Sequence, residues 1–317
     1  MTIISIDSSR TPTIPLAGAT PEPPALASSA APSNKLMGIW RLGQQLAVGP
    51  DCQLWTAQPA DAAGSPRWDY ALRMVPRDGA SAGEREAAIA RLRRAADAAT
   101  AVRHPQLLNI IDASLAGAEP FVVMPRLTGR SLADVLAAGT AQPLPVALWF
   151  VRQAAQACAA LHEAGWAHGN LTPEHVLVSP HGQVTVLGLG SAQQFCRVPA
   201  APPQPAASAP EATPDAQPKV AAGAQPVICD ADASVAAAED VLALGQLLWQ
   251  LMCRVDQRRA PQGSFEAAAE LVADLIHPDP TCRPTCEQLV SRLSELETLS
   301  LGQLICPADS VPLARAA

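Results

Sequence analysis

The feature that most constrains the fold of this chain is a change of pattern near Gly129. Before that residue, short runs of alternating or β-prone residues are bounded by Gly, Pro and Asp, which is typical of strands. These runs occupy residues 40–49, 52–59, 69–76 and 118–127. Between them, residues 84–102 have an apolar spacing of three and four, which predicts a helix. The first part of the chain is therefore expected to be a sheet with one helix.

After Gly129 the sequence predicts helices. Ser131 is a suitable N-cap for a short helix, and residues 145–165 form a strongly amphipathic pattern that Gly165 closes. Residues 239–253 are apolar on most sides, which favours a helix buried at the centre of this second part. A sheet-rich part followed by a helix-rich part predicts two lobes, and a cleft between lobes is a preferred place for a ligand.

Three segments are predicted to lie outside the packed lobes. Residues 1–34 are rich in Pro, Ala, Ser and Thr, so they cannot bury enough apolar surface to offset the entropic cost of ordering. Residues 199–226 hold eight prolines with interspersed Ala and Gln, which predicts a loop or linker inside the domain. Residues 299–317 are expected to be a C-terminal tail. The two lobes are then residues 35–127 and 128–298.

The charge and hydropathy of the chain argue against two classes of partner. A formal net charge of −7 and a pI near 5.4 do not provide the broad basic face that nucleic-acid binding needs. The basic run at 91–94 is better explained as the solvated side of a helix. No run approaches eighteen uncharged apolar residues and no secretory leader is evident, so we expect no membrane partner and a cytoplasmic protein.

The eight cysteines are expected to be reduced thiols, because no export signal accompanies them. Cys282 and Cys286 are four residues apart and could share a helix face. A zinc site needs about four ligands, and no second pair has metal spacing, so a structural role is favoured. No metal site is predicted from His168, His175 or His181 either.

Six landmarks follow one another in a recognisable order between about Ile39 and Leu296. They are "RHPQLLNIID", "FVVMPRLTGRSLADVL", "HGNLTPEHVLV", "VTVLGLGSA", "DVLALGQLLWQL" and "HPDPTCRPT". In this order they resemble the eukaryotic-type serine/threonine protein kinases of bacteria. The third looks like the catalytic loop HRDLKPENVLV, the fourth like the metal-binding strand and turn, and the last like the late DPxxRPT element. The resemblance implies an α+β, bilobal kinase-like fold with a small, mostly antiparallel N-lobe sheet, one N-lobe helix and a larger helical C-lobe.

The positions that carry chemistry in this family depart from its pattern. The resemblance places Arg73 at the strand lysine, Ala95 at the helix glutamate, Asn170 at the catalytic aspartate, and His175 and Gly188 at the two metal ligands. An asparagine amide cannot act as a base near neutral pH, and magnesium prefers hard oxygen ligands. Losing the base alone costs on the order of a hundred to ten thousand fold in rate. Phosphoryl transfer is therefore not expected, and no metal is predicted.

The phosphate-binding and regulatory segments are eroded as well. The glycine-rich loop keeps only Gly49, with Ala47 and Cys52 in the outer places and Pro50 removing one backbone N–H. The arginine that would receive a phosphorylated activation loop is Gly169.

The adenine end of the cleft is less clearly closed. The resemblance implies that Leu54, Ala71 and Leu177 would sandwich a purine, with Met124 behind it and the backbone of Pro125 and Leu127 along its edge. With Arg73, these residues form a candidate nucleotide pocket that needs no metal. The simpler interpretation, favoured here, is that they are core residues of an empty or self-filled cleft.

The retained residues are those that hold the scaffold together. They are His168, Leu171, Pro173 and Leu177 in the loop, Asp240 and Gly245 in the helix that braces it, and Arg283 in the late element. The usual glutamate partner of Arg283 is not evident, and a buried unpaired arginine is costly. We therefore expect Arg283 to find another carboxylate or to be solvated.

Three functional hypotheses follow. The first is a catalytically inactive kinase-like domain that binds, scaffolds or regulates a protein partner in bacterial signalling, such as an active kinase or a phosphatase. The second is an atypical enzyme that uses Arg73 and His175, and it is disfavoured because the phosphate positions lack charge. The third is a sensor that binds ATP or ADP without metal. Binding of ATP, with or without magnesium, separates them.

Overall fold

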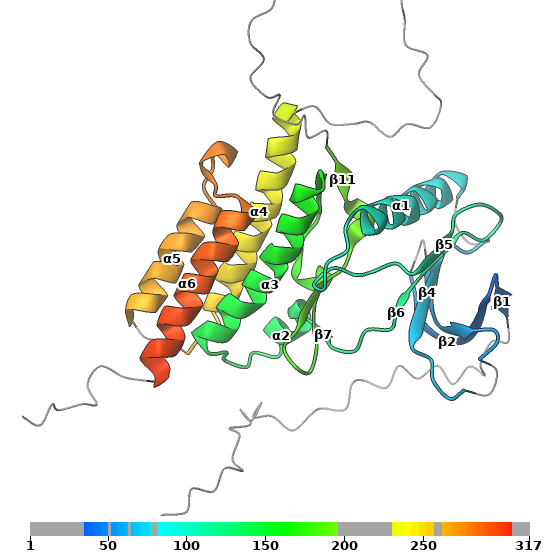
Figure 1. The fold of residues 1–317 in the computed structure, drawn as a ribbon, viewed down its shortest axis with the longest axis horizontal. Helices are drawn as coiled ribbons and strands as arrows, with labels where there is room; N and C mark the ends of the chain where they lie inside the picture. Colours follow the sequence, from blue (N-terminus) through cyan, green and yellow to red (C-terminus); the bar gives the residue numbers. More distant parts are fainter. Residues whose placement is uncertain are drawn as a thin grey trace, which may run out of the picture.

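The computed structural model describes residues 35–49, 52–62, 65–77, 81–195, 230–256 and 262–305. It shows a sheet-based lobe and a helical lobe joined by the segment between Pro125 and Arg130 (Figure 1). The predicted two-lobe α+β architecture is confirmed. The segments predicted as tail and loop at 1–34 and 199–226 lie outside the described residues.

The N-lobe is a six-stranded sheet in the order β1-β2-β3-β4-β6-β5, antiparallel throughout. Its strands are β1 (Leu36–Met37), β2 (Trp40–Val48), β3 (Gln53–Pro59), β4 (Tyr70–Met74), β5 (Asp112–Ser114) and β6 (Phe121–Pro125). One face buries a cluster around Trp40, Leu72 and Phe121. The other face carries Val122, which packs with residues of the single N-lobe helix. The four predicted strands are all present.

Helix α1 (Ala82–Ala101) begins at a capping box in which Ser81 and Glu84 satisfy each other's backbone N–H groups. The hydrogen bonds from Ser81 lower the pKa of Glu84. Ala88, Leu92 and Ala96 face the sheet, which matches the predicted apolar spacing of three and four. Helix α1 thus lies where the sequence predicts the N-lobe helix, and its buried residues determine which side of the helix faces the sheet.

The C-lobe is built from five helices among the described residues, with short strands and turns on one side (Figure 1). The helices are α2 (Leu132–Ala137), α3 (Leu144–Glu163), α4 (Asp230–Met252), α5 (Gln262–Leu275) and α6 (Cys286–Ile305). The strands are β7 (Arg130–Ser131), β9 (Val176–Val178) and β10 (Val184–Val186) in one sheet, and β8 (Trp166–Ala167) with β11 (Gln193–Gln194) in another. The turns are η1 (Pro173–His175), η2 (Leu189–Ser191) and η3 (Pro280–Cys282).

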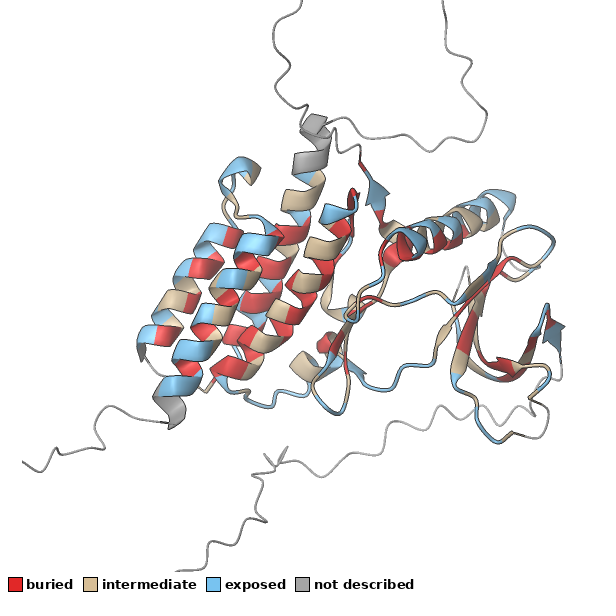
Figure 2. Ribbon diagram, in the orientation of Figure 1, coloured by how far each residue is buried: buried red, intermediate tan, exposed pale blue. Residues whose placement is uncertain are grey.

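The core of the C-lobe lies between α3, α4 and α6, whose facing sides are buried (Figure 2). On α4, Leu244, Leu248 and Leu251 are at most 1% exposed, as predicted for a central helix. One side of α4 departs from that prediction, because Trp249 is 55% exposed. Helix α3 is long and apolar enough to pass a length-and-composition test for a membrane span, yet 67% of that window is buried inside the protein.

The predicted start of the C-terminal tail at residue 299 is wrong. Helix α6 continues to Ile305, and Ser300 is completely buried one turn after Leu296. The small serine side chain continues the buried stripe of the helix, although its polarity made this turn look like a surface segment. The strand of the fourth landmark is β10, as the resemblance implied. The sequence interpretation missed helix α5 and also the short strands β7, β8, β9 and β11, and these strands have too few residues for a readable period.

Candidate functional site

The loop from His168 to Val178 is held from below by helix α4. Asp240 accepts hydrogen bonds from the backbone N–H groups of His168 at 2.7 Å and Gly169 at 2.9 Å. This contact confirms the predicted bracing role of Asp240. The His168 side chain is buried, with Nε2 2.6 Å from the Leu187 carbonyl oxygen, and burial lowers its pKa. A neutral His168 that donates to Leu187 therefore ties the loop to the end of β10.

The two positions predicted from the resemblance as metal-ligand positions lie against each other. Nδ1 of His175 is 2.8 Å from the carbonyl oxygen of Asn170, and the backbone N–H of Leu187 donates to the His175 carbonyl at 2.7 Å. Gly188 has a φ of +85°, and a Cβ built there would lie 2.7 Å from Cδ2 of the His175 ring. The imidazole therefore occupies the room that any side chain at 188 would need.

This arrangement leaves one imidazole and no carboxylate at the two positions. In the described part of the chain, no group of three or more His, Cys, Asp or Glu side chains is placed to hold a metal ion. The His175 and His168 rings lie 5.9 Å apart between their centroids, tilted by 55°. The absence of a bound metal in solution stays a prediction.

Arg73, at the predicted lysine position, lies on β4 opposite Leu54 of β3 and Val122 of β6. Its Nε is buried and has no hydrogen-bond partner, and no ion pair to Arg73 is recorded among the described residues. Ala95, at the predicted glutamate position, packs partly buried against the C-lobe core. The position that the resemblance assigns to the glutamate thus carries no carboxylate.

A different contact joins α1 to the C-lobe. Arg94, next to Ala95, donates from Nε to the carbonyl oxygen of Gly190 in η2 at 2.9 Å. Gly190 allows the close approach, because a Cβ there would lie 3.2 Å from the backbone oxygen of Arg91. The sequence analysis did not identify Arg94, whose basic neighbours gave only the signal of a solvated helix face.

Four of the predicted nucleotide-pocket residues share one face of the N-lobe sheet. The register pairs Leu54 with Arg73 and Ala71 with Met124, and directly paired residues point to the same side. Leu177 lies on β9 of the C-lobe, and Leu127 is 38% exposed in the connecting segment. The structure thus places four of these residues on one sheet face and the other two in the C-lobe and the connecting segment, and the nucleotide pocket stays a prediction.

One backbone N–H group between β2 and β3 already has a hydrogen-bond acceptor within the protein. Gly49 donates its N–H to the Cys52 carbonyl oxygen at 2.8 Å, closing the turn. The sole glycine retained in this loop is therefore already hydrogen-bonded within the protein. This contact reduces what the hairpin could offer to a phosphate group.

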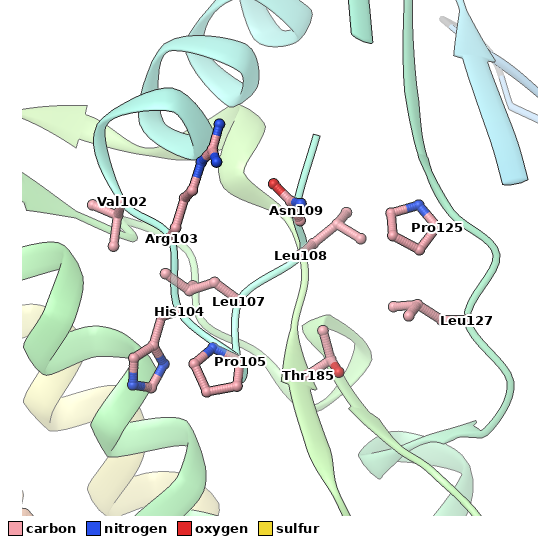
Figure 3. Close-up of a pocket in the computed structure, with 10 residues that line it drawn as sticks. All are labelled: Val102, Arg103, His104, Pro105, Leu107, Leu108, Asn109, Pro125, Leu127 and Thr185. Atoms are coloured by element: carbon pink, nitrogen blue, oxygen red, sulfur yellow. The ribbon is translucent and has the colours of Figure 1, made fainter. Parts of the chain in front are cut away.

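A cavity of about 420 Å³ lies behind the connection between the lobes (Figure 3). It is lined by Val102, Arg103, His104, Pro105, Leu107, Leu108, Asn109, Pro125, Leu127 and Thr185. Of the predicted nucleotide-pocket residues, Pro125 and Leu127 line it. Burial lowers the pKa of His104. No sequence pattern indicated this cavity, because its wall combines segments that are distant in the chain, including the strand β10.

The late element is fixed by an ion pair. Nη1 of Arg283 lies 3.0 Å from Oε1 of Glu239 and 2.9 Å from the Ala238 carbonyl oxygen, and the Arg283 side chain is only 5% exposed. The expectation that Arg283 would find another carboxylate is confirmed. Glu239 immediately precedes Asp240, so one turn of α4 holds both the late element and the loop at His168.

A buried thiol and imidazole cluster in the C-lobe was also missed. Cys158 and Cys286 are 0% and 2% exposed, and both belong to the core of the C-lobe. On the same helix as Cys158, His162 has its Nε2 2.9 Å from Oδ2 of Asp240. Cys282 and Cys286, which the spacing allowed to share a helix face, lie in different surroundings, because Cys282 is exposed and Cys286 is buried. Cys158 and His162 are four residues apart on α3, a spacing visible in the sequence.

Comparison with known proteins decides the family. The pattern of the family described as protein tyrosine and serine/threonine kinase matches residues 42–205, which is about half of the chain. The chain belongs to the protein kinase family. Its two lobes and its His168 loop therefore form a kinase fold of the bacterial serine/threonine type, as the resemblance implied.

Several curated bacterial kinases are similar to this kinase-family chain. The chain is 38% identical over 91 residues to serine/threonine-protein kinase pkn2 of Myxococcus xanthus, covering 28% of this chain and 11% of that protein. It is 26% identical over 166 residues to PknB of Mycobacterium leprae, covering 51% and 25%. It is 28% identical over 124 residues to PknL of Mycobacterium tuberculosis H37Rv, covering 39% and 31%. Each match covers less than a third of the relative's length.

Proposed function

We propose that this kinase-like domain does not transfer phosphate and acts as a binding, scaffolding or allosteric module in bacterial signalling. Its partner would be a protein in the cytoplasm, such as an active kinase or a phosphatase. Asn170 supplies no base, and His175 and Gly188 supply no hard oxygen ligand. The curated relatives are named as kinases, and their activity need not extend to this chain, because a fold does not confer a reaction.

One observation carries the proposal. The His175 ring lies 2.7 Å from where a Cβ at Gly188 would be, so the two positions have room for a single imidazole. A magnesium ion that joins the phosphates of a nucleotide to this loop would need an oxygen ligand from each of the two positions. An imidazole that already donates to the Asn170 carbonyl offers neither charge nor oxygen to such an ion.

A second candidate is a nucleotide sensor that needs no metal. It is favoured by Arg73, which lies on the same sheet face as Ala71. The buried Nε of Arg73 has no hydrogen-bond partner within the described residues. A guanidinium in this position can pair with a phosphate or carboxylate without a bridging cation. The two functions are compatible, because a bound nucleotide could stabilise the surface that a protein partner recognises.

The first experiment is a thermal-shift titration of the purified protein with ATP and ADP, each with magnesium, with manganese and with a chelator. A ligand that binds only the folded state raises the melting temperature. We expect no shift that depends on metal, and no phosphate transfer to a generic substrate or to the chain itself. A shift that requires metal, together with a phosphorylated product, would overturn the proposal.

The matched variant is Arg73→Ala. If nucleotide raises the melting temperature equally with metal and with chelator, and Arg73→Ala removes the rise, the sensor is supported. Arg77→Ala, an exposed arginine beyond the end of the same strand, is the control and should respond like the wild type. No shift at millimolar nucleotide in any condition would exclude the sensor and leave the protein partner as the ligand.

A further inference from the structure

The cavity behind the lobe connection has a buried apolar part and a polar mouth (Figure 3). Val102 and Leu107 line it and are only 8% and 5% exposed. Arg103 and Asn109 also line it, and both are exposed, so they lie where the cavity opens to solvent. Its volume of about 420 Å³ falls within the range of about 300–1,000 Å³ that is typical of small-molecule sites. The cavity therefore has room for a small organic molecule.

The polar groups at the mouth are available to a ligand. No hydrogen bond or ion pair of the Arg103 guanidinium or the Asn109 side-chain amide is recorded among the described residues. In Figure 3 the polar ends of both side chains lie on the same side of the cavity, toward helix α1. Both groups donate hydrogen bonds, and a guanidinium can hold a carboxylate through two parallel bonds. The mouth therefore favours a ligand that carries hydrogen-bond acceptors.

The chain around the cavity is basic, although the protein as a whole is acidic. The protein has 29 Asp and Glu residues against 22 Lys and Arg residues. The lining comes from residues 98–111, 120–133 and 182–194, and these stretches contain Arg103, Arg126 and Arg130 but no aspartate or glutamate. A local positive potential attracts anions and repels cations. The charge around the cavity therefore favours an anionic ligand.

The apolar side chains around the cavity are incompletely covered by the protein. Leu127 is 38% exposed, and Leu108 and Pro125 are partly exposed. Figure 3 shows Leu108 and Pro125 pointing toward each other, with Thr185 and Leu127 below them. Removing apolar surface from water is favourable in proportion to its area. A ligand with an apolar body would gain this free energy, so the lining favours a molecule that is apolar at one end and anionic at the other.

We propose that this cavity binds a small amphipathic anion, whose apolar body lies against Leu107 and Leu108 while its carboxylate pairs with Arg103. The site is distinct from the predicted nucleotide pocket, because neither Ala71 nor Leu177 lines it. It is also independent of the proposed function, since neither phosphate transfer nor a protein partner enters the argument. An ion pair at an exposed mouth is weakened by water, so the apolar body supplies most of the affinity and the carboxylate supplies selectivity.

The test is isothermal titration calorimetry of the full chain with 2-naphthoate, in which fused aromatic rings carry a carboxylate. The control ligand is 2-naphthamide, which has the same rings and no charge. We expect saturable binding at one site per chain, with 2-naphthoate bound about fivefold more tightly than 2-naphthamide. Added salt should reduce this preference, because it screens the pair with Arg103.

Variants locate the ligand. Arg103→Ala should weaken binding of 2-naphthoate by about fivefold and leave 2-naphthamide unchanged, so that the loss depends on the charge of the ligand. Arg93→Ala is the matched control, because Arg93 is exposed on α1 and does not line the cavity. It should bind both ligands like the wild type. Thr185→Phe places an aromatic ring in the cavity from β10, where a strand tolerates it, and should abolish binding of both ligands.

Three results would overturn the proposal. The first is a wild type that shows no saturable binding of 2-naphthoate. The second is equal affinity of the wild type for the two ligands. The third is a folded Thr185→Phe variant, as judged by its melting temperature, that binds 2-naphthoate like the wild type. If Thr185→Phe does not fold, the affinities of the wild type, Arg103→Ala and Arg93→Ala for the two ligands still decide the question.

Discussion

At the scale of single residues, His175 and Gly188 act as one unit, and their coupling can be measured. Gly188→Ala should lower the free energy of unfolding by about 1–3 kcal/mol, because a Cβ is strained at positive φ. It also meets the imidazole of His175 at 2.7 Å. In a His175→Ala background the steric part of the cost should vanish and only the backbone strain should remain. Chemical denaturation of the four proteins measures this coupling.

The control for this cycle is Gly83→Ala in the first turn of α1. No heavy atom lies within 4 Å of a Cβ built there, and its backbone is helical, so the substitution should be neutral or slightly stabilising. Equal costs of Gly188→Ala with and without the imidazole would show that His175 does not fill the space beside Gly188.

The pair His162 and Cys286 predicts an unusual pH profile. His162, with its pKa raised to about 10, contributes stability that is fully present below pH 6.5 and is lost as pH rises through 10. Cys286, with its pKa lowered to about 6, contributes stability that is present above pH 9 and is lost as pH falls through 6. Between pH 6.5 and 9 the two slopes oppose each other, so the wild type should show a plateau.

Cys286→Ala should remove one of the two slopes. The free energy of unfolding of this variant should then fall as pH rises above 6.5, by on the order of 1 kcal/mol per pH unit, because Asp240 still favours the His162 proton in the folded state. The fall should end below pH 10, because Cys286 no longer contributes to the raised pKa of His162. Denaturant titrations at several pH values measure the slope, and Cys282→Ala should keep the plateau. A flat profile for Cys286→Ala would mean that His162 is not protonated in the folded protein at neutral pH.

At this scale the sequence could predict which residue types occupy the key positions, but not which contacts these residues make. The identities of Asn170, His175 and Gly188 follow from the order of the landmarks. That the imidazole fills the space beside Gly188 does not, because it depends on the rotamer of one ring and the φ of one glycine. The partner of Arg283 was predictable only as a class, since Glu239 becomes its neighbour through the packing of α4 against η3.

At the scale of elements, Arg94 fastens α1 to the η2 turn. Arg94→Ala should lower the free energy of unfolding by about 1–2 kcal/mol, because loss of the charged donor leaves the carbonyl oxygen of Gly190 without its hydrogen bond. It should also increase amide hydrogen exchange in η2 and the neighbouring turns of α1. The control is Arg93→Ala, since Arg93 is exposed on the same helix. Equal effects of the two substitutions would show that the hydrogen bond from Arg94 to Gly190 does not stabilise the contact between α1 and η2.

Elements with a clear apolar period were predictable, whereas helix α5 and most of the short strands were not. Helices α1 and α3 carry several turns of apolar periodicity, and Ser81 and Gly165 mark their ends. Strands β7 to β11 have two or three residues each, so no period exists to be read, and their pairing is set by the lobe around them. The end of α6 was misplaced because Ser300 is polar by type and buried by position.

At the scale of the whole molecule, the boundary of the C-lobe can be tested by truncation. A chain that ends at Thr298 should melt several degrees lower than a chain that ends at Ile305, because it lacks the last turns of α6 and the buried Ser300. Circular dichroism during heating measures both. Equal melting temperatures would restore the boundary at residue 298 that the sequence suggested.

The architecture as a whole was predictable because it rests on many weak and independent signals. Strand runs, helix periods and six ordered landmarks agree, and consistency across levels is what specifies a fold. The content of the cleft depends instead on a few side chains, and the cavity behind the lobe connection depends on loops that meet only in three dimensions. The function of the domain is correspondingly a proposal, whereas its family is established.

The fit between the His175 ring and Gly188 has a consequence for engineering a metal site into this loop. An aspartate introduced at position 188 alone would meet the imidazole, and an asparagine introduced at position 175 alone would lie beside a glycine that has no carboxylate. The two substitutions would therefore have to be made together in one variant.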